Sequence, residues 1–145
     1  PLKSCSSLSR MIVGELPDGA AETLGELVNL TELRLYSTPE VDLSCLTRLQ
    51  KLRDLDLFGS TVSHPEFLAL LPNLRYLNLG QTGISDLSFL KQLPAMTDVD
   101  LREDPLTDLS PLLDCPWLSL LTLSKWHQSL AEEQLSSASF KIQFQ

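Results

Sequence analysis

Residues 71–92 read LPNLRYLNLGQTGISDLSFLKQ, with apolar residues at the first, fourth, seventh and ninth positions. The same four positions are apolar in six successive stretches of 22 residues, beginning at Cys5 and ending at Leu123. At an apolar content of 43%, agreement at all 24 positions would arise by chance on the order of once in a billion. The sequence therefore contains an internal repeat, whose apolar-x-apolar pairs are Met11/Val13, Leu33/Leu35, Leu55/Leu57, Leu77/Leu79, Val99/Leu101 and Leu121/Leu123.

The second half of each repeat carries further apolar residues, clearest at Ile84, Leu87 and Leu90 and again at Leu106, Leu109 and Leu112. In the second repeat Val41 comes one place late, which indicates a local bulge. The segment PEFLALLPN, residues 65–73, predicts a short helical turn that begins near Pro65. A leucine-rich helical bundle is excluded, because it would space apolar residues about 3.6 positions apart without a period of 22 residues.

Each apolar-x-apolar pair predicts a short β-strand, because alternate strand residues point to opposite faces of a sheet. Stacked repeats place these strands side by side as a parallel sheet, with neighbours ~4.8 Å apart. The leucines line the interior, and the chain returns behind each strand through short turns or 3₁₀ helix. No single coil can bury its apolar face, so stability comes from contacts between neighbours and from end caps.

Segments such as residues 71–92 resemble leucine-rich repeats of the 22-residue class, similar to those of bacterial internalins and phosphatase-regulator proteins. The resemblance covers Cys5 to Lys125 and implies an α/β solenoid. This is a right-handed coil with a parallel β-sheet on its concave face and short 3₁₀, helical or irregular return segments. The family usually carries Asn three places after each pair, where this chain has Leu16, Thr38, Ser60, Thr82, Asp104 and Trp126. Thr, Ser and Asp can also bond to the backbone, whereas Leu16 and Trp126 mark irregular ends.

The expected domain organisation is six 22-residue repeats over residues 1–125 and a C-terminal cap over residues 126–145. In the cap, SLAEEQLSSA (residues 129–138) predicts a short helix with Ser129 as its N-cap. The alternation of Phe140, Ile142 and Phe144 then predicts a last strand, one residue out of the 22-residue register. Because the sequence starts at Pro1 and lacks an apolar cover before Cys5, it is expected to be a fragment of a longer chain or to expose its first coil.

The 145 residues amount to one domain, 34 of them leucine, with 11 Lys and Arg against 19 Asp and Glu and a net charge of −8. This acidic balance disfavours nucleic-acid binding, which needs a basic patch. No apolar run approaches the ~18 residues of a membrane span. The sequence leaves the oligomeric state open, although an unpaired first strand could pair with another copy.

Three cysteines without CxxC spacing favour a reducing, cytoplasmic location over a disulfide scaffold. Cys5 and Cys115 fall at core positions of the repeat, and Cys45 is expected at or near the surface. The two histidines, His64 and His127, are expected at the surface and are isolated from the cysteines, so we predict no metal site and no cofactor.

Function is expected on the face formed by the outward strand residues, since repeat proteins bind partners on such extended faces. Asp54, Asp56, Asp98 and Asp100 would place four carboxylates there, beside aromatic residues of the kind found in interface hot spots. The sequence thus predicts a non-enzymatic protein-binding module whose partner offers a basic, partly apolar surface. The candidate partner-binding residues are Arg34, Tyr36, Asp54, Asp56, Phe58, Tyr76, Asp98, Asp100 and Arg102.

Several alternatives compete with this hypothesis. The carboxylates could serve only solubility, with Phe58 packed under a loop. Asp54 and Asp56, ~6–7 Å apart at Cα, would suit acid–base catalysis or a divalent cation, but a smooth repeat surface is expected to offer no pocket. The chain could also be a structural or regulatory segment of a larger protein, enzymatic or not. A special case of the binding hypothesis is an inhibitor that masks a basic enzyme, for which binding would depend strongly on salt.

Overall fold

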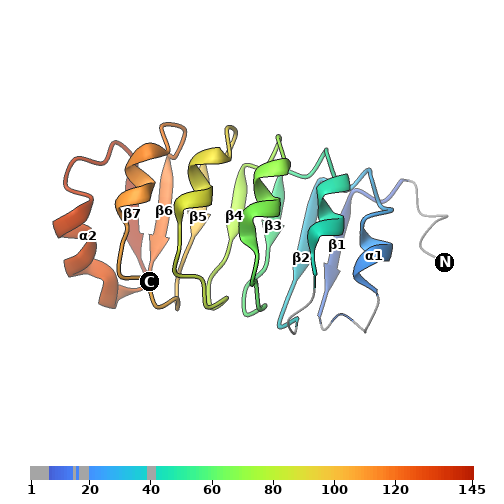
Figure 1. The fold of residues 1–145 in the computed structure, drawn as a ribbon, viewed down its shortest axis with the longest axis horizontal. Coiled ribbons are helices and arrows are strands. Elements are labelled where there is room, and N and C mark those ends of the chain that lie inside the picture. The colour runs from blue at the N-terminus through green and yellow to red at the C-terminus, as the bar shows by residue number, and fades with distance from the viewer. Residues whose placement is uncertain (1–6, 15, 17–19, 39–41) are drawn as a thin grey trace.

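A computed structural model describes residues 7–14, 16, 20–38 and 42–145 of the chain. Seven strands form one sheet in chain order, and every neighbouring pair is parallel. Figure 1 shows this sheet as open and uncurled, with the return segments covering one side of it. The predicted parallel-sheet solenoid is therefore confirmed. The strands are β1 (Arg10–Val13), β2 (Glu32–Leu35), β3 (Asp54–Asp56), β4 (Tyr76–Asn78), β5 (Asp98–Asp100), β6 (Leu120–Leu123) and β7 (Lys141–Phe144).

The return segments are short helices, most of them 3₁₀. Three of these begin in the same way, because an aspartate two residues before the helix start accepts a hydrogen bond from the first helical N–H. The Oδ1–N distances are 2.8 Å for Asp42–Ser44, 2.8 Å for Asp86–Ser88 and 2.9 Å for Asp108–Ser110. The helices are α1 (Ala21–Leu24), η2 (Ser44–Arg48), η3 (Pro65–Leu70), η4 (Ser88–Gln92), η5 (Ser110–Asp114), η6 (Lys125–His127) and α2 (Gln128–Gln134).

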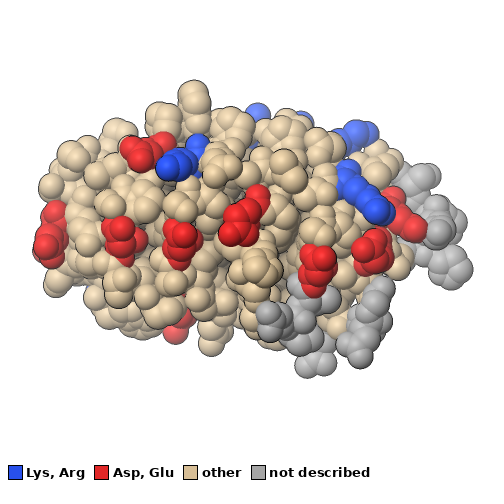
Figure 2. Space-filling view, viewed as in Figure 1, with Lys and Arg blue, Asp and Glu red and all other residues tan. Residues whose placement is uncertain are grey.

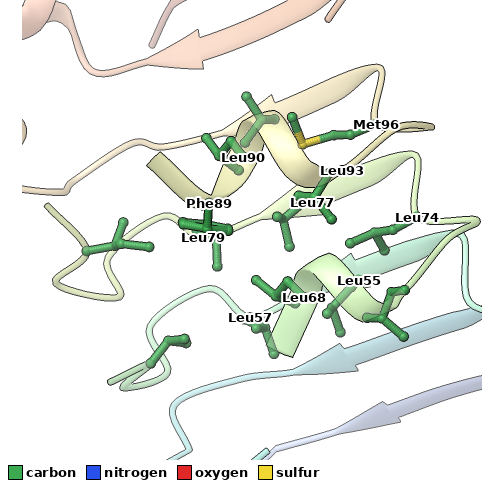
Figure 3. Close-up of a cluster of buried hydrophobic side chains, with 14 of the residues drawn as sticks. Leu55, Leu57, Leu68, Leu74, Leu77, Leu79, Phe89, Leu90, Leu93 and Met96 are labelled. Carbon is green, nitrogen blue, oxygen red and sulfur yellow. The ribbon is translucent and has the colours of Figure 1, made fainter. Parts of the chain in front are cut away.

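The core lies between the sheet and the return segments. The four repeat-defining positions are buried in every repeat from Leu27 to Leu123. Figure 3 shows side chains of this kind packed between the strands β3 and β4 and the return helices. In the first repeat the described members Leu8, Met11 and Val13 are only half-buried. Within the described residues no strand lies beyond β1, so this coil has a neighbouring strand on one side only. Cys5 and Val41 lie outside the described residues.

A buried polar row runs beside the core at the positions where the family carries Asn. Ser60 Oγ accepts the Thr38 N–H at 3.2 Å and donates to the Leu35 carbonyl at 3.1 Å. Asp104 Oδ1 accepts the N–H groups of Thr82, at 3.0 Å, and of Gly83, at 2.8 Å. These bonds join the second repeat to the third and the fourth to the fifth, so Ser and Asp can take such bonds in the middle repeats, as the sequence predicts.

At the C-terminal end, β7 pairs with β6 so that Ile142 faces Leu121, a step of 21 residues that matches the expected shift in register. The helix α2 precedes it, but Ser129 lies inside α2 and His127 occupies the position before its start. The expectation that Ser129 caps the helix is therefore wrong. The reason is that η6 runs directly into α2 and moves the helix start ahead of the serine. The division of the chain into six repeats and a cap stays a prediction.

Two expected surface residues are buried. Cys45 is 6% exposed, and its thiol donates to the Ala21 carbonyl at 2.9 Å, because η2 packs closely against the preceding coil. His127 is 4% exposed, and this burial lowers its pKa. Its neighbour Trp126 is instead 63% exposed, and the indole N–H donates to His127 Nε2 at 3.2 Å. Both expectations failed because the return side is more tightly packed than the repeat pattern alone indicates.

Candidate functional site

The outward side chains of the strands form two rows on the open side of the sheet, which we call the strand face. Parallel pairing without any shift between β1 and β6 aligns the two rows across the repeats. One row is Arg10, Glu32, Asp54, Tyr76, Asp98 and Leu120. The other is Ile12, Arg34, Asp56, Asn78, Asp100 and Thr122. Six predicted site residues stand in these rows, and Tyr36, Phe58 and Arg102 follow one or two positions after β2, β3 and β5.

Two of the four predicted surface carboxylates are buried. Asp56 is 9% exposed and accepts hydrogen bonds from the Phe58 N–H, at 3.1 Å, and from the Tyr36 hydroxyl, at 3.2 Å. Asp100 is 6% exposed and accepts from the N–H of Arg102 at 3.1 Å. Each carboxylate thus satisfies the backbone two residues further on, as local side-chain bonds of Asp commonly do. Both carboxylates are therefore engaged within the sheet, and their predicted contact with a partner stays a prediction.

Arg102 adds to the structural role of Asp100. Its Nε lies 3.0 Å from both carboxylate oxygens, and its terminal nitrogen lies 2.9 Å from Oδ2. This hydrogen-bonded pairing raises the pKa of Arg102. The same guanidinium also donates to Gln145 Oε1, next to β7. Arg102 therefore stabilises the end of β5 through its bonds to Asp100 and Gln145, which occupy the guanidinium that a partner would otherwise contact.

The other two carboxylates are more accessible. Asp98 is half-buried and accepts a hydrogen bond from the Thr97 hydroxyl at 2.6 Å. Asp54 is exposed, and partial burial, followed by repulsion from Glu32, raises its pKa. A carboxylate next to a second acid gains from a cation brought close to both. Asp54 is therefore the acid on this face best placed to meet a basic side chain.

A pocket of about 340 Å³ opens on the strand face over β2, β3 and β4. The sequence had predicted a smooth surface here, and the pocket corrects that prediction. Arg34 is exposed at its rim and is held by Glu32, with nitrogen–oxygen distances of 2.9 and 3.0 Å. Burial, then the charges of Asp56 and Asp100, raises the pKa of Tyr76. The lining residues are Glu32, Leu33, Arg34, Asp54, Asp56 and Tyr76.

Four of the predicted site residues line this pocket, and sequence reasoning missed Glu32 as a site residue. The signal was available, because Glu32 is aligned with Asp54 in the same row and precedes Arg34 by two positions on one strand face. Tyr36, which is half-buried, reaches the pocket only through its bond to Asp56. Most of the nine predicted residues thus separate into a pocket group and a group that braces the strand ends, and Asp98 belongs to neither.

The strand face is mixed in charge rather than uniformly acidic. Its two rows, taken with Arg102 and Lys141, carry five carboxylates, of Glu32, Asp54, Asp56, Asp98 and Asp100, and four cations, of Arg10, Arg34, Arg102 and Lys141. Most of the net charge of −8 therefore lies elsewhere. Figure 2 shows where: on the side of the return helices, acidic side chains are spaced along the length of the molecule.

Among the residues that the structure describes, no three His, Cys, Asp or Glu side chains gather in a way that could hold a metal ion. In the same part of the chain, no helix has both the length and the apolar character needed to cross a membrane.

The family described as Leucine Rich repeats (2 copies) matches residues 72–114. No curated protein matches the sequence. The fold is similar to an internalin (inlF) from Listeria monocytogenes, with 30% identity and a TM-score of 0.71, over 83% of this chain and 36% of the internalin. The chain thus spans about a third of that protein's length. The chain is therefore similar to leucine-rich repeat proteins, the internalins among them, as its sequence predicts.

Two more distant structures share the fold. A leucine-rich repeat protein from Leptospira interrogans is 22% identical, with a TM-score of 0.75, over 99% of this chain and 38% of that one. A plant peptide hormone receptor, solved in complex with RGF2, is 21% identical, with a TM-score of 0.66, over 86% of this chain and 22% of the receptor. Leucine-rich repeat domains are typically non-enzymatic modules for protein interaction.

Proposed function

We propose that this chain is a non-enzymatic interaction module whose strand face binds a partner protein at the pocket over β2, β3 and β4. The observation that carries the proposal is the pocket itself, in which exposed Asp54 and half-buried Tyr76 lie beside the Arg34–Glu32 ion pair. A tyrosine ring beside charged groups supplies both apolar area and a polar edge, a combination enriched at interfaces.

The partner should present a basic side chain next to an apolar one. Glu32, Asp54 and Asp56 bring three carboxylates to the pocket, and its one guanidinium, that of Arg34, is already paired. A partner lysine or arginine placed against Asp54 would offset the repulsion from Glu32. Apolar atoms of the partner would cover Tyr76. A plant peptide hormone receptor of similar fold was solved in complex with RGF2, which supports a binding role for a repeat module of this kind.

The test is capture of a partner by wild-type protein, compared with two charge-reversal variants. Asp54→Lys alters the pocket, whereas Asp114→Lys makes the same change in charge at an exposed position on η5. We expect Asp54→Lys to lose the partner and Asp114→Lys to retain it. If both variants retain it equally, the assignment of the strand face is wrong. Asp56 is unsuitable for this purpose, because its substitution would free the Phe58 N–H and the Tyr36 hydroxyl.

We also propose that the protein works in a reducing, cytoplasmic location. The two cysteines among the described residues, Cys45 and Cys115, are free thiols in the core. For Cys115, burial raises the thiol pKa to about 11, which disfavours the reactive thiolate. Cell fractionation of the full-length protein tests this proposal, and recovery from the secreted fraction would contradict it.

A further inference from the structure

A second hollow surface lies on the side of the return segments, away from the strand face. It consists of two pockets, of about 310 Å³ and about 580 Å³, which share Val62, Ser63 and Glu66 and therefore form one continuous groove across three repeats. We call it the return groove. The groove runs from Asp42, before η2, to Gln92, at the end of η4.

The third repeat departs from its neighbours where it lines the groove. Leu43, Leu87 and Leu109, which precede η2, η4 and η5, have nearly the same backbone conformation, with φ between −95° and −103° and ψ between −3° and 11°. His64, which precedes η3, is instead extended, with φ −132° and ψ 76°. Pro65 is the cause, since a proline forces the residue before it out of the helical region. His64 also stands where Asp86 and Asp108 bond to the helix start in the later repeats.

The groove has an apolar floor and an acidic rim. Its floor includes buried Leu43 and Val62 and half-buried Phe67 in the first pocket, and Phe89 in the second. Its rim carries the carboxylates of Asp42, Glu66 and Asp86. No lysine or arginine occurs among its described lining residues. Figure 2 shows that acidic side chains are spread along this side of the molecule, so the groove lies in a negative field.

We propose that the return groove is a second binding site, for an extended peptide segment in which apolar side chains alternate with lysine or arginine. The apolar side chains would occupy the two pockets over Val62, Phe67 and Phe89. The basic side chains would lie against Glu66, Asp42 and Asp86, since no lysine or arginine occurs among the described residues that line the groove. Charge complementarity and the apolar floor together select this occupant over an acidic or a fully polar segment. The site is independent of the strand face, so both can be filled at once.

The test uses a labelled synthetic heptapeptide in which lysines alternate with leucines. One control peptide carries glutamate in place of lysine, and a second carries serine in place of leucine. The protein variants are Glu66→Lys, at the junction of the two pockets, and Asp114→Lys, which makes the same change in charge outside the groove. Both residues are exposed, so both variants are expected to unfold at the temperature of the wild type.

We expect the lysine–leucine peptide to bind the wild type, and Glu66→Lys to raise its Kd about tenfold. Asp114→Lys should change the Kd less than about twofold, because separated surface charges are largely screened. Both control peptides should bind about tenfold more weakly than the lysine–leucine peptide. Amide shifts on titration should gather at Ser44, Ser63 and Ser85 rather than at Asp54 and Tyr76.

Several results would overturn the proposal. Equal weakening by the two variants would mean that the peptide responds to net charge alone. Equal binding of the serine peptide would show that the apolar floor is not used. Shifts confined to the strand face would assign the peptide to the pocket of Asp54, and absence of binding to the wild type would remove the site altogether.

Discussion

The Phe58 ring lies against the backbone of Gly80 in the next repeat. A Cβ atom on Gly80 would stand 3.0 Å from Phe58 Cδ2 and 3.0 Å from the Arg102 carbonyl oxygen. Glycine therefore leaves the space that the ring fills, and Phe58 is half-buried although it follows an outward strand position. The ring joins the third repeat to the fourth beside the pocket, which explains an aromatic residue here without requiring that it contact a partner.

Gly80→Ala is expected to destabilise the protein by about 1–3 kcal/mol, because the new methyl group must displace either the Phe58 ring or backbone. Urea unfolding measures the change. Gly14→Ala is the control, since a Cβ at Gly14 meets nothing within 4 Å of the described structure. Equal effects of the two substitutions would mean that the Phe58–Gly80 contact contributes no packing.

The residue just before the buried polar row is left-handed in four successive repeats, with φ of 52° at Ser37, 70° at Gly59, 58° at Gln81 and 65° at Glu103. Side chains with a Cβ rarely adopt this conformation, which costs about 1–2 kcal/mol. Gln81→Gly is therefore expected to raise the free energy of unfolding by up to about 1 kcal/mol, after the entropic cost of glycine. The reverse change, Gly59→Ala, should lower it by a similar amount. Chemical unfolding of both variants checks the pair, and changes of the same sign would contradict the account.

Asp104 should make stability depend on pH. Burial raises the pKa of Asp104 from 3.8 to about 6, and the N–H groups of Gly83 and Thr82 oppose that rise. The folded protein then holds this proton more tightly than the unfolded chain, so its stability falls as pH rises from 3.8 to about 6. The loss amounts to about 1–3 kcal/mol.

Asp104→Asn should remove that loss while keeping an oxygen acceptor for Thr82 and Gly83. The measurement is the difference in unfolding free energy between wild type and variant across pH. The difference is needed because His127, whose pKa is lowered, contributes a dependence of the opposite sign. A difference that does not change between pH values below 3.8 and above about 6 would show that the carboxyl carries no burial penalty.

Partner binding on the strand face should weaken with salt. Raising the ionic strength from about 0.1 M to about 1 M shortens the Debye length from about 10 Å to about 3 Å, which screens exposed Asp54. Asp54→Asn should reduce the slope of the Kd against salt, and Asp114→Asn should not. An affinity that is independent of salt would contradict the proposed basic partner and the idea of a masking inhibitor alike.

The period of 22 residues was enough to predict the strands, their parallel order and the core, because the same apolar positions are buried in successive repeats. Finer roles depend on contacts that no periodicity encodes. Asp56 and Asp100 occupy outward positions, yet each turns its carboxylate onto the N–H two residues later. A clue to such local bonding was present on the return side, where the triplet Asp-Leu-Ser recurs at residues 42, 86 and 108.

The two hollows were also beyond sequence reasoning, because they result from departures from the repeat rather than from the repeat itself. The return groove lies where the backbone of His64, before Pro65, differs from that of its counterparts in the neighbouring repeats. The strand-face pocket is lined in part by Arg34 and Glu32, whose pairing no periodicity encodes. The aligned rows placed the right residues near one another but did not indicate a depression between them.

The proposed use of the strand face is tested most directly by photo-crosslinking. A benzophenone amino acid is placed, one position at a time, at Arg34, at Asp54 and at Leu113, all of which are exposed. Leu113 lies on η5, on the opposite side of the sheet. If the partner binds the strand face, we expect crosslinks to the captured partner from positions 34 and 54 and none from position 113. Crosslinks from position 113 alone would contradict binding on the strand face.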